Sequence, residues 1–193
     1  MTNIISRRTL MAGLPIAAAG AGAALLAPGA AQAATSGREI QRQASGALAQ
    51  LYRAHPQTKT LAARAVADLI FPKIIKAGLI IGGQSGDGVL RIRGQVSGFY
   101  NLSAASFGLQ AGGQSFSYAL FFMTEASLNY LIRSDGWAIG TGPSVVVMDK
   151  GAAASMNSMT LTQDVYAFPF GQKGLMAGLG LEGSKITRIN PVP

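Results

Sequence analysis

The stretch AGLIIGGQSGDGVLRIRG, residues 77–94, decides how the rest of the chain is interpreted, because its glycines resemble those of a nucleotide-binding loop. A dinucleotide fingerprint must open a helix, whereas Gly86-Asp87-Gly88 is followed by Val89-Leu90-Arg91, which is typical of a strand. Ser-Gly and Asp-Gly instead supply the positive φ values of tight turns between strands. We therefore predict that residues 83–88 form a hairpin turn.

Downstream of this stretch the apolar residues recur with a period of two, which indicates strands. Most of the 25 glycines of the chain lie between Gly78 and Gly183, as in a small, strongly curved sheet with bends and bulges. The tetrapeptide Gly-Gly-Gln-Ser occurs at residues 82–85 and 112–115, which we interpret as coincidence. The predicted strands are Val89–Ser97, Phe116–Phe122, Val145–Met148, Leu161–Phe168, Leu175–Leu181 and Ile186–Ile189.

Upstream the period is helical. Apolar residues three or four apart predict a helix over 38–55, ended by Pro56, and a second over 59–71, stopped by Pro72, with Arg64 and Asp68 on its outer side. A further helix over 124–133 interrupts the strands. The predicted fold class is α+β, with N-terminal helices packed on a Gly-rich, curved antiparallel sheet or small barrel that contains one inserted helix.

The N-terminus resembles an export signal. Ser6-Arg7-Arg8-Thr9-Leu10-Met11 is similar to the twin-arginine signal of bacteria, a weakly apolar run follows, and Ala31-Gln32-Ala33 fits a cleavage site. A Sec signal or a retained anchor is the alternative. We expect residues 1–33 to be a signal peptide, residues 34–193 to be a single domain, and the protein to be periplasmic or secreted.

The net charge and the amino-acid composition limit the classes of binding partner and of functional site that the chain can have. The full chain has a net charge of +8, and loss of residues 1–33 removes two arginines and no acid, which leaves 14 − 8 = +6. Such a surplus favours anionic partners, and export disfavours nucleic acid among them. The absence of cysteine excludes disulfides, thiolate nucleophiles and Cys-ligated metals.

Residues for catalysis or metal binding are sparse. The single histidine, His55, stands at a predicted helix end, no Ser-x-x-Lys occurs, and the acidic residues are scattered singly. Gly178 to Lys185 only approximates a P-loop, since its last two residues are transposed. The sequence therefore predicts a protein that is not an enzyme and needs neither a metal nor a cofactor.

Positive charges remain as candidate binding groups. Lys73 and Lys76 enter the first Gly-rich strand, and Arg91 and Arg93 lie on one face of the next. If these strands pair across the predicted turn, the four cations lie close together, as a headgroup-binding patch or as a solvated strand face. The arginine stripe of helix 38–55 can lie at a bilayer surface or face water while the helix packs on the sheet.

Several short sequence blocks follow one another in a characteristic order and spacing between residues 60 and 190. They are Phe71-Pro72-Lys73, Ala77-Gly78 with Gly82-Gly83, Gly86-Asp87-Gly88, Gly94 with Phe99-Tyr100, residues 108–115, Phe122-Met123-Thr124, Gly136-Trp137 with Gly140, Asp164-Val165-Tyr166, Lys173-Gly174-Leu175 and Leu181-Glu182-Gly183. Together these blocks resemble the SYLF lipid-binding family. The resemblance implies binding of membrane lipids, with phosphoinositide binding and an association with actin in eukaryotic members.

For an exported bacterial chain the resemblance carries over to lipid binding in general. We expect a non-enzymatic envelope protein that binds anionic phospholipid headgroups or a membrane surface; the protein partner, if any, is unknown. The alternatives are a structural or interaction module for envelope proteins or polymers, an outer-membrane barrel and an unrecognised hydrolase. Gln110 and Gln114 match the family and can bind a headgroup or satisfy backbone at a bulge. The candidate lipid-binding residues are Arg38, Arg42, Lys73, Lys76, Arg91, Arg93 and Lys173.

Overall fold

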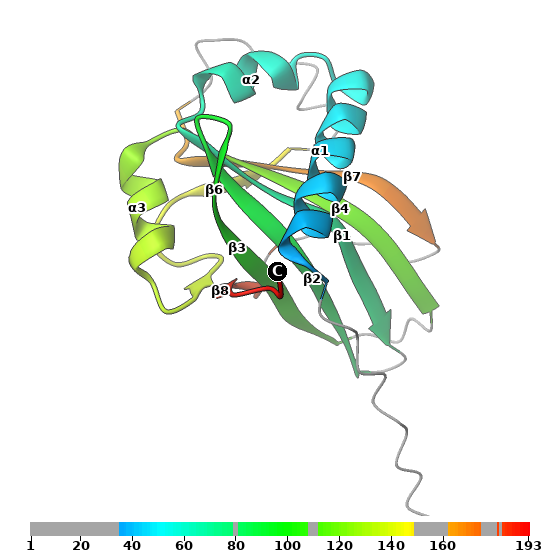
Figure 1. The fold of residues 1–193 in the computed structure, drawn as a ribbon. Helices are drawn as coiled ribbons and strands as arrows, with labels where there is room; N and C mark the ends of the chain where they lie inside the picture. The colour runs from blue at the N-terminus through cyan, green and yellow to red at the C-terminus, as the bar shows by residue number, and fades with distance from the viewer. Residues whose placement is uncertain (1–34, 79–80, 108–111, 149–161, 175–180, 182) are drawn as a thin grey trace, which may run out of the picture. The chain divides into compact units, whose positions relative to one another are not determined.

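The computed structural model describes residues 35–78, 81–107, 112–148, 162–174, 181 and 183–193. All of them belong to one compact unit, Ala33–Pro193. The described part of this unit holds three helices and one curled sheet, a mixed half-barrel (Figure 1). The predicted α+β class, with helices at the N-terminus, is confirmed.

The first helix, α1 (Gly37–Ala54), follows from a cap and an apolar stripe. The hydroxyl of Ser36 accepts a hydrogen bond from the backbone N–H of Glu39, and the N–H of His55 closes the last turn on the carbonyl of Leu51. The predicted helix over 38–55 is confirmed, with His55 as its C-cap. Its buried apolar residues are Ile40, Ala44, Ala47, Leu48 and Leu51.

The second predicted helix is correct only in its first half. Helix α2 (Thr58–Arg64) ends early, and the chain becomes extended at Ala65 and enters strand β1 (Ala67–Gly78). Leu69 and Phe71 point into one core and Ile70 into the other. A strand that is buried on both faces has a continuous apolar run, which its periodicity does not distinguish from a helix.

The eight strands of the described residues form one sheet in the order β5-β8-β3-β2-β1-β4-β7-β6. All neighbouring strands are antiparallel except β6 and β7, which are parallel. Strand β1 lies in the middle, under α1 (Figure 1). The remaining strands are β2 (Ile81–Ile92), β3 (Gln95–Phe107), β4 (Gly112–Phe122), β5 (Trp137–Ala138), β6 (Val145–Val147), β7 (Val165–Gly174) and β8 (Lys185–Ile189).

The hairpin turn between β2 and β3 lies at Arg93–Gly94, so the prediction of a turn at 83–88 is wrong. Ile92 pairs with Gln95, and the two residues between them have φ values of 50° and 80°. Positive φ at both positions is the type I′ turn that suits twisted strands. Because a two-residue loop preserves the alternation of side chains, the sequence pattern ran through it and suggested one strand over 89–97.

The glycines of the 83–88 stretch allow β1 and β2 to approach closely. A Cβ atom on Gly88 would lie 2.6 Å from the carbonyl oxygen of Ile70, and one on Gly86 would lie 2.9 Å from the Cα atom of Ile74. Side chains at these two positions would collide with the backbone of β1. Only glycine therefore lets β2 pass this point unbroken.

Opposite these glycines β1 carries a bulge. The register of β1 shifts against β4 between Phe71 and Ile74, and against β2 between Ile70 and Ile75. Pro72 lies inside the shift, where its lack of an N–H does not cost a ladder hydrogen bond. Bulges bend a strand and increase its twist. The bulge therefore contributes to the curl of the sheet.

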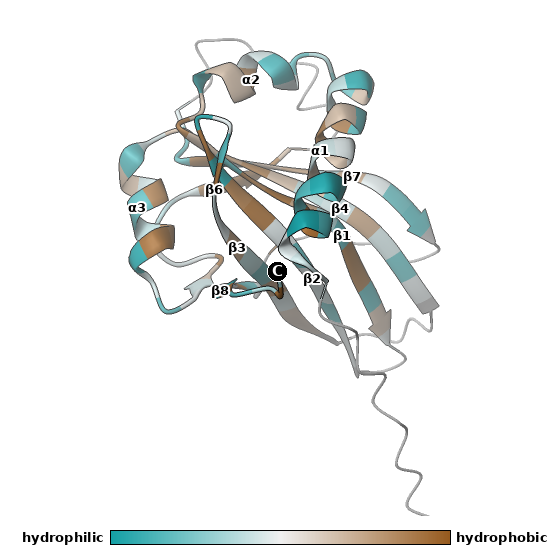
Figure 2. Ribbon diagram, viewed as in Figure 1, coloured by the Kyte–Doolittle hydropathy of each residue, from teal (hydrophilic) through white to brown (hydrophobic). Residues whose placement is uncertain are grey.

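The sheet carries a hydrophobic cluster on each face. Figure 2 shows hydrophobic residues along the middle of the central strands and paler, more polar residues toward their free ends. The face under α1 and α2 buries residues such as Ile70, Val89, Ala119, Phe121 and Phe168 against the stripe of α1. The opposite face buries Leu69, Phe71, Leu90, Tyr100, Leu102, Phe116, Tyr118, Leu120, Phe122 and Trp137, and α3 contributes Leu128 and Leu131.

Helix α3 (Glu125–Arg133) confirms the predicted inserted helix, with Thr124 as its N-cap. Asp164, just before β7, connects this cap to the segment before β6: it accepts hydrogen bonds from the backbone N–H of Ser144 (3.0 Å), from the Ser144 hydroxyl (2.9 Å) and from the Thr124 hydroxyl (3.4 Å). These bonds, those from Ser144 first, lower the pKa of Asp164.

Most of the other predicted strands are found. The predictions at 116–122, 145–148 and 186–189 correspond to β4, β6 and β8. The strand predicted over 161–168 begins later, at Val165. The strand predicted over 175–181 lies outside the described residues except for Leu181.

Candidate functional site

A cleft of about 560 Å³ lies between α1 and the strands beneath it. Its floor is the bulged part of β1 and the facing parts of β4 and β7, and its wall is one side of α1. The lining residues are Gln43, Ala47, Gln50, Pro72, Lys73, Ser115, Phe116, Ser117, Gly171 and Lys173.

The bulge shapes the floor of this cleft. The hydroxyl of Ser117 donates a hydrogen bond of 2.7 Å to the carbonyl oxygen of Pro72, a carbonyl that lies at the register shift. Strand β7 is irregular at the same level, where Gly171 has a φ of 65°. Two adjacent irregularities therefore expose backbone and hydroxyl groups at the floor, where a regular ladder would present alternating side chains.

The wall of the cleft is a polar stripe of α1. Gln43, Ala47 and Gln50 are separated by four and three residues, so they share one side of the helix, next to the buried stripe. The amide of Gln43 donates a 2.7 Å hydrogen bond to Glu39, which leaves its carbonyl oxygen as an acceptor. The small side chain of Ala47 between the two glutamines leaves room between the helix and the sheet.

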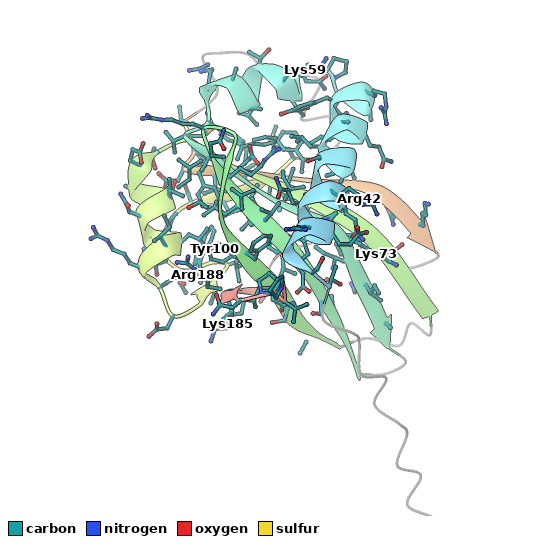
Figure 3. All side chains as sticks on the ribbon, in the orientation of Figure 1. Arg42, Lys59, Lys73, Tyr100, Lys185 and Arg188 are labelled. Atoms are coloured by element: carbon teal, nitrogen blue, oxygen red, sulfur yellow. The ribbon has the colours of Figure 1, made fainter. Side chains whose placement is uncertain are left out.

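The charge of the cleft is positive. Lys73 comes from β1 and Lys173 from β7, both are exposed, and the lining contains no aspartate or glutamate. In Figure 3, Lys73 lies beside α1, just below Arg42. Two ammonium groups, two carboxamides and two hydroxyls thus surround one concave space. Such a set can hold an anionic, oxygen-rich group such as a phosphate.

Of the seven candidate lipid-binding residues, the structure brings Lys73 and Lys173 together in this cleft. Lys76 lies elsewhere: it pairs with Gln114 and shares the face of Ile74, which is the face opposite to α1. Sequence reasoning missed Gln43, Gln50, Ser115 and Ser117. The only available signal was the seven-residue spacing of Gln43 and Gln50, which places these two side chains on the same side of a helix.

Arg91 is part of an ion pair and does not lie beside Lys73 and Lys76. Its Nε atom lies 2.7 Å from Oδ1 of Asp68, and about one sixth of each side chain is exposed (17% and 16%). Burial raises the pKa of Asp68, an effect that the bond to Arg91 opposes. The expected cluster of four cations is therefore wrong: the register between β1 and β2 places Arg91 opposite Asp68.

The arginines at the start of α1 and at the turn are exposed. Arg42 donates a 2.7 Å hydrogen bond to Glu39, which holds the pKa of that carboxyl down at about 2. Arg38 and Arg93 are exposed as well. The stripe of α1 that carries Arg38 and Arg42 therefore faces away from the sheet. None of the described helices is long and apolar enough to span a membrane.

The described residues include no group of three or more His, Cys, Asp or Glu side chains that could hold a metal ion. Of the two glutamines that match the SYLF pattern, Gln110 lies outside the described residues. Gln114 is buried on the face opposite to the cleft. It therefore takes no part in this site.

Comparison with known protein families gives one match. Residues 103–190 match the model of the family described as Ysc84, Las17-binding protein actin regulator. No curated protein matches the chain. The matched range runs from β3 through β8 and includes Ser115, Ser117 and Lys173 of the cleft. Residues 103–190 are therefore similar to the Ysc84 (SYLF) domain, the family that the sequence motifs indicate.

Proposed function

We propose that the protein is a non-enzymatic lipid-binding protein of the bacterial envelope, and that the cleft under α1 binds an anionic phospholipid headgroup. The Ysc84 (SYLF) family is a family of lipid-binding and actin-regulating domains. The observation that carries the proposal is the pairing of Lys73 with Lys173 in one cleft, without an acidic side chain in its lining.

The binding follows from the chemistry of the lining. The two ammonium groups donate to phosphate oxygens, and such charge-assisted hydrogen bonds are stronger than neutral ones. The Ser115 hydroxyl and the amides of Gln43 and Gln50 supply further polar partners for the ester oxygens or hydroxyls of a headgroup. Each basic residue near an anionic membrane surface contributes on the order of 1 kcal/mol, so Arg38, Arg42 and Arg93 add a general attraction.

The cellular setting comes from the sequence. The twin-arginine motif at Arg7-Arg8 and the small residues before Ala34 support export to the periplasm or beyond. Anionic phospholipid is available there at a membrane surface. A protein or polymer of the envelope is the second candidate partner, since the family is described by the protein that it binds, Las17.

The test is flotation with liposomes. The protein, purified in the form that cells accumulate, is mixed with vesicles of neutral phospholipid that contain increasing fractions of phosphatidylglycerol, at low and high salt. We expect salt-sensitive flotation that increases with the anionic fraction. The double variant Lys73→Gln/Lys173→Gln should lose at least tenfold in apparent affinity, because it removes both ammonium groups of the cleft.

The matched control is Lys59→Gln/Arg53→Gln, which removes the same charge from two exposed residues outside the cleft. It should lose only a few-fold through general electrostatics. Equal losses in both double variants would place binding on net charge alone. Absence of flotation at every anionic fraction would contradict lipid binding and favour a protein or polymer partner.

A further inference from the structure

The turn between β2 and β3 contains Arg93, the one non-glycine residue with a positive φ in the described part of the chain, where φ is 50°. Glycine and asparagine adopt this conformation at a lower cost than arginine does, and Asn-Gly is the pair that a type I′ turn favours. Arg93 is exposed, and it makes no salt bridge with any of the described residues. A strained backbone at an exposed cation points to a role for this side chain outside the fold.

Next to this turn the outer edge of β3 is open. Strand β8 pairs with residues 99–103 of β3 and ends at Ile189. The chain then turns away toward α1, where the carbonyl oxygen of Val192 accepts a hydrogen bond from the N–H of Gly37. The first residues of β3, 95–98, therefore have β2 on one side and, among the described residues, no strand on the other.

The backbone of Val96 points out of this open edge. Ile92 and Gln95 close the two-residue turn as a hydrogen-bonded pair, so the next pair, Arg91 and Val96, is of the kind that forms no hydrogen bonds between its two strands. The N–H and C=O of Val96 are therefore directed away from β2. Gln95, Val96 and Ser97 are all exposed, Val96 to 39%, so this part of the edge is open to solvent.

A second arginine borders the same edge. Arg188 lies on β8 opposite Tyr100, as Figure 3 also shows. Its guanidinium reaches Gly98, since a Cβ atom on that glycine would lie 3.6 Å from Nη2 of Arg188. Arg188 is exposed and, like Arg93, makes no salt bridge within the part of the chain that the structure describes. The edge thus has an exposed arginine near each end, and residues 95–98 include no acidic side chain.

We propose that this edge binds an extended, acidic segment of another protein, which joins the sheet as a strand beside β3, in line with β8. The backbone of Val96 supplies main-chain hydrogen bonds, the mode by which exposed sheet edges bind peptides. The two arginines pair with acidic side chains of the segment, because a guanidinium matches a carboxylate in a bidentate geometry. Two copies of this chain would instead bring arginines against arginines. The surface is separate from the cleft and does not depend on the function proposed for it.

The test is an NMR titration of the ¹⁵N-labelled protein with synthetic peptides. The first peptide has alternating valine and threonine between two terminal glutamates, and the second has lysines in place of the glutamates. We expect the first to shift the backbone amides of Val96 and Ser97 saturably and to slow the hydrogen exchange of the Val96 N–H. The second should leave these signals unchanged. A third peptide, the glutamate peptide with alternate amides N-methylated, cannot join a sheet and should not bind.

Two variants test the arginines. Arg93→Asn places a better residue in the turn, so it should raise the thermal midpoint and still weaken binding of the glutamate peptide about fivefold. The higher midpoint would exclude loss of folding as the cause. Arg188→Gln should weaken binding by a similar factor. The control Lys73→Gln/Lys173→Gln removes two charges from the cleft and should bind the peptide as the original protein does, so this test and that of lipid binding fail separately.

The proposal is overturned if the glutamate peptide leaves these amides unshifted, or if the lysine peptide or the N-methylated peptide shifts them equally. It is also overturned if Arg93→Asn binds the glutamate peptide as tightly as the original protein does. Shifts of the same amides on concentrating the protein alone would mean that the edge joins two copies of the chain, and equal shifts with short-chain phosphatidylglycerol would mean that the arginines serve a membrane surface. Either result would overturn the proposal as well.

Discussion

The basic side chains of this domain differ in whether an acidic side chain pairs with them, and the net charge of the chain does not reveal which of them are paired. Arg91 is held by Asp68 and Arg42 by Glu39. Lys73 and Lys173 line the cleft without an acidic neighbour in its lining. The sequence identified all four as candidates, because charge is visible in a sequence and pairing across strands is not.

At the residue scale, Asp164 provides a test of the hydrogen bonds that connect the segment before β6, α3 and β7. The variant Asp164→Asn retains the shape but loses the charge that accepts from Ser144 and Thr124. Hydrogen bonds to a charged acceptor are the stronger ones, and for this partly exposed group we expect a loss of about 1 kcal/mol in the free energy of unfolding at pH 7. Urea unfolding measures the loss.

The stabilisation by the Asp164 carboxylate should depend on pH in a defined direction. The hydrogen bonds from Ser144 lower the folded-state pKa of Asp164 below its unfolded value of about 3.9. The stabilisation is therefore complete above that pH and is lost as the pH falls through the folded-state pKa. The difference from Asp164→Asn should shrink at pH 3, whereas the exposed control Asp135→Asn should differ by less than about 0.5 kcal/mol at both pH values. A difference that persists at pH 3 would contradict a charge-based role.

At the scale of elements, the close approach of β1 and β2 at the bulge predicts an unequal cost of glycine substitution. Gly88→Ala would place a Cβ atom 2.6 Å from the Ile70 carbonyl oxygen and from Cδ1 of Phe71. Overpacking of this kind costs about 1–3 kcal/mol, and we expect the upper part of that range because backbone is involved. Thermal or urea unfolding measures the cost.

The control for this substitution is Gly113→Ala in β4, where a Cβ atom would meet nothing within 4 Å. It should be neutral or stabilise by about 0.5 kcal/mol, through the reduced freedom of the unfolded chain. Equal effects of the two substitutions on stability would mean that the glycines of β2 are needed for their backbone conformation and not for the close approach of β1 and β2.

The helices that the sequence predicted well have one buried face. Helices α1 and α3 have a single apolar stripe and a side-chain cap, so periodicity and the caps Ser36 and Thr124 located them. Strand β1 was partly taken for a helix, because both its faces are buried. The Arg93–Gly94 turn was missed because a two-residue loop leaves the alternation intact.

At the scale of the domain, the cleft depends on segments that are far apart in the chain. Gln50 comes from α1, Lys73 from the bulge of β1, Ser117 from β4 and Lys173 from β7. Their meeting requires the strand order β1-β4-β7 and the position of α1 across it. Neither is encoded in local patterns, so sequence reasoning proposed single residues of this site without its shape.

The wide separation of paired strands along the chain bears on the export that we propose. Strand β3 pairs with β8, near the end of the chain, so the sheet is complete only once the last strand has been made. A translocase that carries folded proteins fits such a domain, and we propose the Arg7-Arg8 pair as its recognition motif. We expect Arg7→Lys/Arg8→Lys to abolish most of the export, so that the variant accumulates in the cytoplasm with residues 1–33 attached.

Cell fractionation and intact-protein mass measure this outcome, and the exported original protein should begin at Ala34. The control is Arg38→Lys/Arg42→Lys, which makes the same conservative change beyond the cleavage site and should be exported normally. Unchanged export of Arg7→Lys/Arg8→Lys would indicate the Sec route, which carries unfolded chains. The sheet would then form only after translocation, from a chain whose central strand β1 has emerged well before its partner β4.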